Sequence, residues 1–155
     1  MKPLTGQFDC KVDAKGRFLM PSALRKQLPE DEQSDFVVNR GLEKCLVIYP
    51  RRVWDSMMEK IYAKNQFIEK NRRFARRFTA GSKELALDGS DRVLLPKNLI
   101  GYAGLGKEIV LLCQYNRVEV WDKAAFDAAL EMEDEDFADL AEDVMGDDDG
   151  LMGML

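Results

Sequence analysis

Two stretches of this chain follow one pattern and decide its fold: DAKGRFLMPSAL at residues 13–24 and DGSDRVLLPKNL at residues 88–99. They align without a gap, from the first aspartate to the last leucine. Further along, LVIY at 46–49 aligns with VEVW at 118–121 after a small shortening. Self-similarity of this length indicates a duplicated structural unit. We therefore expect two copies of one small fold.

Each copy predicts the same order of elements. A strand leads through a tight DxxxR turn into a short apolar strand. A proline then ends that strand, because it cannot donate to a strand ladder, and it suits the first turn of the helix that follows. A two-stranded hairpin and a longer helix complete the copy. The expected strands are 5–12, 17–20, 36–40, 45–49, 79–87, 92–95, 107–113 and 117–121, and the expected helices are 22–28, 51–78, 97–103 and 122–144.

One copy alone leaves an apolar sheet face uncovered, and two copies packed together bury it. The predicted fold class is therefore α+β, a single pseudo-symmetric body built from two internal repeats and flanked by helices. Residues 1–78 form the first repeat with its closing helix, and residues 79–145 form the second. Residues 146–155 are expected to be an acidic disordered tail, because they hold a run of aspartates and little that packs.

Composition excludes several classes of protein. The chain contains no histidine, so Ser-His-Asp and Cys-His catalytic units and histidine zinc sites are ruled out. Its three cysteines lie far apart and form no CxxC pair, which argues against a disulfide framework and a zinc site. No glycine-rich phosphate loop or nucleophile–base pair is present. We expect no enzyme activity, catalytic residue, metal, cofactor or small-molecule substrate.

The charge is divided unevenly along the chain. Residues 124–155 hold 12 acidic residues and no basic one, which leaves 23 basic and 16 acidic residues in 1–123, a net charge of +7 there. A basic body followed by an acidic tail is typical of nucleic-acid binders. No apolar run is long enough to cross a bilayer, and no secretory signal is apparent, so a cytoplasmic protein without a membrane partner is expected.

The first DxxxR loop, residues 13–17, is a candidate DNA contact. Asp13 is expected to fix the turn by accepting hydrogen bonds from backbone amides, and Gly16 supplies a positive φ. Arginine's planar fork suits phosphates and the guanine edge. The alternative is a local Asp13–Arg17 ion pair that only holds the hairpin. The DNA-contact candidates of this loop and the strand before it are Lys11, Lys15, Gly16 and Arg17.

The second loop, residues 88–92, places two carboxylates beside one arginine. Asp88 is the expected structural residue of this turn. Arg92 is a further DNA-contact candidate, but the negative local charge repels phosphate. Internal pairing of Arg92 with Asp88 or Asp91 is therefore the favoured alternative.

The helix expected over 51–78 contains a polar stretch, 63–66, that is expected to bend it or to end its first segment. A cluster of arginines lies near the end of this helix. Its members are Arg72, Arg73, Arg76 and Arg77. Such a cluster suits a DNA backbone. It equally suits a solvated helix end, where cations complement the helix dipole, or an acidic partner on a neighbouring subunit. The solvated face is the favoured interpretation.

The order, spacing and duplication of these segments resemble the MraZ family over roughly residues 5–125. The first signature spans 5–25, and the second spans 88–96, 102–105 and 116–122. The resemblance implies an AbrB-like swapped-hairpin β-barrel and assembly of copies into rings. It also implies sequence-specific binding to short tandem repeats upstream of the division and cell-wall gene cluster. One residue departs from the family pattern, because Asp91 stands where glycine is usual.

These observations predict a DNA-binding transcriptional repressor, cytoplasmic and associated with the nucleoid. Its expected partners are double-stranded DNA and further copies of itself. Two alternatives stay open: a ring-forming protein-interaction scaffold, and an AbrB-like antitoxin or global regulator.

Overall fold

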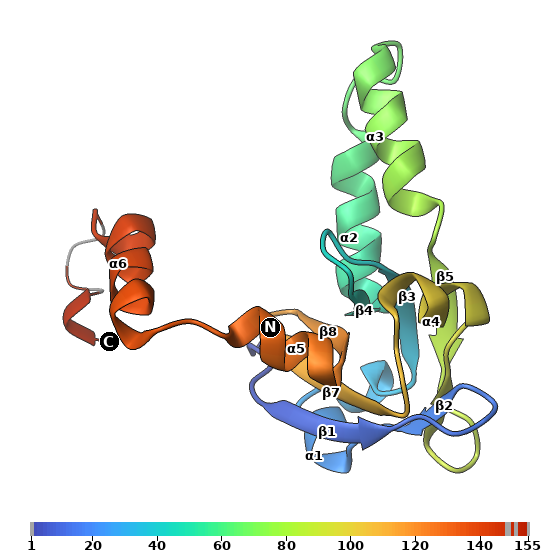
Figure 1. Cartoon of the computed structure of the whole chain (residues 1–155). Coiled ribbons are helices and arrows are strands. Elements are labelled where there is room, and N and C mark those ends of the chain that lie inside the picture. The colour runs from blue at the N-terminus through green and yellow to red at the C-terminus, as the bar shows by residue number, and fades with distance from the viewer. Residues whose placement is uncertain (1, 148–149, 151, 155) are drawn as a thin grey trace. The chain divides into compact units, whose positions relative to one another are not determined.

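The computed structural model describes residues 2–147, 150 and 152–154 (Figure 1). The residues up to Lys123 form one compact unit, and those from Ala124 onward form a second. Strands and helices are both present, and the strand pairings are antiparallel. The fold is therefore α+β, and both repeats contribute strands to the first unit.

The largest sheet has six strands in the order β1-β7-β8-β4-β3-β5. Strands β1, β3 and β4 of the first repeat correspond to β5, β7 and β8 of the second. Exchanging every strand for its counterpart gives the same strand order in reverse. The sheet therefore has an internal pseudo-two-fold axis between β4 and β8. Its strands are β1 (Gln7–Lys11), β3 (Asp35–Arg40), β4 (Leu46–Pro50), β5 (Lys83–Ala86), β7 (Glu108–Gln114) and β8 (Arg117–Asp122).

The two repeats exchange their first strands. β1 of the first repeat pairs with β7 of the second, and β5 of the second repeat pairs with β3 of the first. Each hairpin, β3–β4 or β7–β8, thus gains its third strand from the other repeat. Half of the chain would lack this pairing, so the two repeats complete one another.

The remaining strands, β2 (Arg17–Leu19) and β6 (Arg92–Leu94), form a separate antiparallel ribbon. Phe18 lies opposite Val93 in this ribbon, and both are almost completely buried. The described strands thus form an open sheet and a ribbon in place of the single closed β-barrel that the resemblance implies. The physical reason lies in Pro21 and Pro96, which follow closely on the two ribbon strands and prevent them from continuing as ladders.

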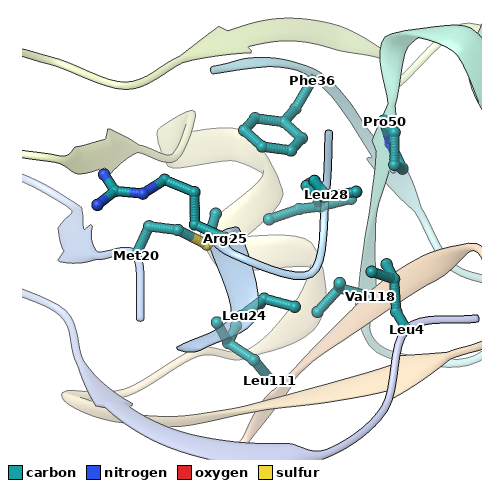
Figure 2. Close-up of a pocket in the computed structure, with 10 residues that line it drawn as sticks. Leu4, Met20, Leu24, Arg25, Leu28, Phe36, Pro50, Leu111 and Val118 are labelled. Carbon is teal, nitrogen blue, oxygen red and sulfur yellow. The ribbon is translucent and has the colours of Figure 1, made fainter. Parts of the chain in front are cut away.

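The main hydrophobic core combines side chains of both repeats beneath the sheet. Leu24 and Leu28, at and just beyond the short helix α1 (Ser22–Arg25), face Phe36 of the first repeat and Leu111 of the second. Figure 2 shows these side chains converging. The space left between them, about 10 Å³, is near the minimum for one water, so this region is packed core. The matching helix of the second repeat is α4 (Lys97–Ala103).

The segment predicted to be helical over 51–78, with a bend or an end at 63–66, is a helical hairpin. Helix α2 (Arg51–Tyr62) ends at the polar stretch 63–66, and α3 (Glu69–Thr79) runs back beside it (Figure 1). The side chain of Asn65 accepts a hydrogen bond from the Phe67 amide and so stabilises the turn. Trp54 of α2 stacks on Phe78 of α3, with ring centroids 5.9 Å apart. The strand expected from residue 79 begins only at Lys83, because α3 continues to Thr79.

The buried side-chain amide of Asn39 forms a hydrogen bond between the sheet and this hairpin. Asn39 of β3 is fully buried, and its side chain donates a hydrogen bond of 2.7 Å to the carbonyl of Phe78. Its side-chain oxygen accepts from the amide of Arg40. Val37, Val47 and Trp54 form a second hydrophobic cluster on the same side of the sheet. Strands β3 and β4 are therefore buried on both faces.

The helix predicted over 122–144 is also two helices, α5 (Lys123–Leu130) and α6 (Asp134–Met145). Acidic residues at 131–136 are unfavourable at the C-terminus of α5 and favourable in the first turn of α6, because of the helix dipole. The disordered tail expected over 146–155 falls partly outside the described residues. Within it, Met152–Met154 forms one 3-10 turn. Across the described parts of the chain, no helix combines the length and apolarity needed to cross a membrane.

The buried ribbon pair gives the first prediction. Phe18→Ala removes a buried ring from beneath the ribbon and should lower the free energy of unfolding by about 3–5 kcal/mol in urea titration. Leu19→Ala, one residue further and 60% exposed, is the control and should change stability by about 0.5 kcal/mol or less. Equal losses from both variants would contradict the assignment of Phe18 to the shared core.

Candidate nucleic-acid interface

The first DxxxR loop is held closed by one carboxylate. One oxygen of Asp13 accepts hydrogen bonds from the backbone amides of Lys15 and Arg17, both at 2.9 Å. The other oxygen accepts from Arg17 Nε at 2.8 Å. These bonds, the Arg17 amide first, hold the pKa of Asp13 below its ordinary value of 3.8. Gly16 completes the turn at φ +88°, a left-handed conformation that favours glycine.

The second loop repeats this geometry. Asp88 accepts from the amides of Ser90 and Arg92 at 2.8 and 3.0 Å, and from Arg92 Nε at 3.1 Å. The Arg92 amide is again the largest cause of a lowered Asp88 pKa. Both arginines are thus paired within their loops, through Nε alone. The terminal nitrogens of both guanidinium groups make no hydrogen bond within the described residues, so they remain available to a ligand.

The β2–β6 ribbon brings both arginines to one surface. Phe18 and Val93 point inward, so their neighbours along each strand point outward. Arg17 lies opposite Leu94, and Leu19 lies opposite Arg92. Leu19 is 60% exposed and Leu94 is 56% exposed. The outer face of the ribbon therefore presents two arginines and two leucines, related by the pseudo-two-fold axis.

The two loops differ in what stands at their fourth position. Gly16 packs beside Ile100, since a Cβ at position 16 would come within 3.1 Å of the Ile100 Cδ1 atom. At the equivalent place, Asp91 adopts φ +61° and forms a 2.7 Å ion pair with Arg25. Arg92 was expected to pair with Asp88 or Asp91. It pairs with Asp88, whereas Asp91 pairs with Arg25. The apolar contact between Gly16 and Ile100 in one loop is thus replaced by the Asp91–Arg25 ion pair in the other.

A hollow of about 310 Å³ beside the first loop collects lysines. Lys15 reaches it from the loop, Lys97 from the start of α4, and Lys107 from the segment before β7. All three side chains are exposed, and none forms an ion pair within the described residues. The residues aligned with Lys15 and Lys97 in the other repeat are serines, Ser90 and Ser22. These three lysines thus lie at the end of the ribbon that carries Arg17.

Sequence reasoning identified Lys15 but missed Lys97 and Lys107. Both belong to the second repeat, and only the exchange of strands brings them beside the first loop. Lys11 is exposed on β1, directly before this loop, but it does not line the hollow. The sequence did contain a signal for Lys97, because it aligns with a serine in the other repeat, as Lys15 does.

The cysteines show no sign of reactivity. Cys45 and Cys113 are buried, and burial raises the pKa of both thiols, that of Cys45 to about 12. A thiol with such a pKa is protonated at neutral pH and is a poor nucleophile. Within the described ranges, no group of three or more acidic or cysteine side chains is arranged to hold a metal ion.

Comparison with known proteins gives a consistent result. A family model described as "MraZ protein, putative antitoxin-like" matches residues 4–78 and again residues 78–148. The transcriptional regulator MraZ of Christiangramia forsetii is 50% identical over 147 residues, 94% of this chain and 95% of that protein. Its namesake in Flavobacterium psychrophilum is 46% identical over 94% of each chain. The one in Pediococcus pentosaceus is 39% identical over 90% of this chain and 95% of its own.

The two loop carboxylates predict a pH dependence of stability. Their pKa values are lowered in the folded state, so their contribution is complete well above the ordinary value of 3.8 and is lost as the pH falls through 3.8 and then through the lowered values. The double variant Asp13→Asn, Asp88→Asn retains acceptor oxygens but does not titrate. Urea titrations should show its stability deficit against the wild type shrinking as the pH falls from about 5 to about 2.5. A deficit that stays constant would show that these carboxylates do not stabilise the fold through their charge.

Proposed function

The chain belongs to the MraZ family, and we propose that it is a sequence-specific DNA-binding transcriptional regulator that acts as a repressor and has no catalytic activity. Relatives up to 50% identical over most of the chain carry the name transcriptional regulator. The observation that carries the DNA contact is the outer face of the β2–β6 ribbon, where carboxylates orient two arginines and a lysine-lined hollow lies beside the loop of Arg17. This arrangement suits a polyanion such as DNA, whose base edges offer hydrogen-bond acceptors to the arginines.

A two-stranded ribbon is a suitable element for this contact. The major groove of B-DNA admits a two-stranded β-ribbon, and arginine bonds the O6 and N7 atoms of guanine there. Arg17 is oriented through Nε by Asp13, which leaves its terminal nitrogens directed to a base or phosphate. Gly16 supplies the left-handed turn that holds Lys15 and Arg17 on either side of it. Exposed leucines on the same face suit contact with thymine methyl groups.

The two ends of the ribbon have different roles in this proposal. At the Arg17 end, Lys11, Lys15, Lys97 and Lys107 neutralise phosphates. At the other end, Arg92 is paired in the same way, but Asp91 and the serines around it supply no positive charge. Arg92 therefore makes the weaker contact. Asp13 and Asp88 act through the arginines that they position.

The remaining features of the proposal come from the family resemblance. They are tandem promoter repeats upstream of the division and cell-wall gene cluster, a ring of identical subunits, and a place in the cytoplasm on the nucleoid. The exchange of first strands supports assigning the body to the AbrB-like swapped-hairpin class. Several weak contacts held in one particle bind repeated sites by avidity, which is how a small cationic ribbon would achieve affinity.

Selection from random double-stranded DNA tests this function. Fragments retained by the full chain should become enriched in a short motif, and fragments with several copies should bind more tightly than those with one. Retention without any enriched motif would refute sequence-specific regulation. No retention at all would leave the protein-interaction scaffold as the better function.

In the proposed contact, Arg17 reads bases, whereas Lys97 and Lys107 bind phosphates, so variants of these residues should have different effects. Arg17→Ala should cost about 1–3 kcal/mol on the enriched site and relax its base preference, with a smaller loss for Arg92→Ala. The double variant Lys97→Ala, Lys107→Ala should weaken all sequences alike and lower the salt slope by about 2. Lys83→Ala, on an exposed position of β5 outside the hollow, is the control. Equal losses from Arg17→Ala and Arg92→Ala would show that the ribbon ends act alike.

A further inference from the structure

The arginine cluster of the helical hairpin lies on one exposed face of α3. Ala75 is buried, and Asn71 and Phe78 are partly buried, so their side of the helix faces the protein. The helical period places the basic side chains of α3 on the opposite side. All of them are exposed, and they form what we call the basic face of α3: Lys70, Arg72, Arg73, Arg76 and Arg77.

The helix dipole accounts for only part of this face. Arg76 and Arg77 lie in the last turn of α3, where cations are favourable. Helix α3 begins at Glu69, so Lys70 and Arg72 lie at its N-terminal end, where cations are unfavourable. The solvated helix end that the sequence favoured therefore does not explain the whole cluster, because α3 is a separate, short helix.

The charge of the basic face is uncompensated within the described residues. Like charges repel at a spacing of four residues, as in the pairs Arg72–Arg76 and Arg73–Arg77. No basic side chain of α3 forms an ion pair in the described parts of the chain, although Arg72 donates a hydrogen bond of 2.9 Å to a backbone carbonyl of the hairpin turn. Residues 60–77 hold seven basic residues and one acidic residue, a net charge of +6. A bound polyanion would relieve this repulsion.

The hairpin and the ribbon lie on opposite sides of the six-stranded sheet. Phe18 and Val93 of the ribbon belong to the main core, on one face of the sheet. Trp54 and Phe78 of the hairpin pack against Val37 in the second cluster, on the other face. Figure 1 shows the hairpin extending from the sheet away from β2. The basic face of α3 is therefore separate from the ribbon and its loops.

A DNA duplex has the charge density that suits this face. The 11 residues of α3 span about 16 Å at about 1.5 Å per residue. A duplex carries about one negative charge per 1.7 Å of its axis, so phosphates are present along the whole length of such a helix. The planar fork of arginine binds phosphate oxygens bidentately. Within the described residues, no carboxylate orients these arginines as Asp13 orients Arg17, so they suit a backbone and not a base edge.

We propose that the basic face of α3 binds the phosphate backbone of a DNA duplex without reading its sequence. Because this contact lies apart from the ribbon, a chain that holds one duplex segment at the ribbon can hold a second segment at α3. The protein then bridges two DNA segments. This inference goes beyond the proposed regulatory function, because the α3 contact requires neither a promoter motif nor base reading by Arg17.

Salt titration on a duplex without the enriched motif tests the contact. The double variant Arg72→Ala, Arg76→Ala removes one row of the basic face and keeps residues that favour a helix. It should bind this duplex several-fold more weakly at low salt and lower the salt slope by about 2. The control Lys2→Ala, Lys83→Ala removes the same charge from exposed positions outside α3 and the ribbon, and it should keep the wild-type slope. An unchanged slope in the α3 variant, or an equal decrease in both variants, would overturn the proposal.

Two further measurements exclude a folding defect and a protein ligand. Urea titration should show the α3 variant to be at least as stable as the wild type, because a pair of like charges is removed. The second row, Arg73→Ala, Arg77→Ala, should give the same decrease in salt slope. Light scattering should show the wild-type mass for both variants. A changed mass would mean that the basic face contacts another protein surface, and DNA would then be the wrong ligand.

Capture of a second duplex tests the bridging. A surface-bound duplex with the enriched motif is saturated with the full chain and then exposed to a labelled duplex without the motif. The wild type should capture the labelled duplex, whereas Arg72→Ala, Arg76→Ala should stay bound to the motif and capture little. Equal capture by both would show that other ribbons hold the second duplex, which contradicts bridging through α3. If selection enriches no motif but the salt slope still falls in the α3 variants, the sequence-specific function fails and the α3 contact stands.

Discussion

Strand exchange between the repeats is the constraint on which the rest of this structure depends. β1 completes the hairpin of the second repeat and β5 completes that of the first, so each repeat would otherwise leave an unpaired edge and an uncovered apolar face. Because β2 follows β1 and β6 follows β5, the same exchange carries both DxxxR loops to the pseudo-two-fold axis. There Phe18 and Val93 close over the shared core, and the arginines next to them point outward. The candidate interface is therefore a consequence of how the core is completed.

Backbone symmetry in the ribbon coexists with a clear asymmetry of side chains. Gly16 beside Ile100 corresponds to Asp91 beside Arg25, so the carboxylate at a left-handed position has its partner in the other repeat. Three lysines line the hollow at the glycine end. In the proposed DNA contact, each copy would therefore have a cationic end and a neutral end, which gives it a direction on the duplex. Direct repeats match such a contact better than inverted ones, because every copy then meets its site in the same orientation.

The sequence predicted local elements well where a residue imposes a backbone constraint. The prolines and the DxxxR turns placed the ribbon strands and α4, and the duplicated pattern predicted a shared body. The polar stretch 63–66 indicated a bend or an end of the helix over 51–78, but the sequence did not predict that the second segment runs back beside the first, because that arrangement depends on contacts such as Trp54 with Phe78. Lys97, Lys107 and the Asp91–Arg25 pair also required the structure. Each depends on which repeat lies beside which loop, and that information is carried by strand pairing between distant segments.

The acidic C-terminal segment carries more than charge, because its helix α6 also contains apolar residues at a regular spacing. An acidic segment that only solvates or screens a basic body needs no periodic apolar residues. Phe137, Leu140 and Val144 are periodic, so this segment carries a surface to be buried as well as a charge. The basic charge is divided as well, because residues 51–79 carry a net charge of +6, whereas the DNA candidate residues lie on the ribbon and its loops.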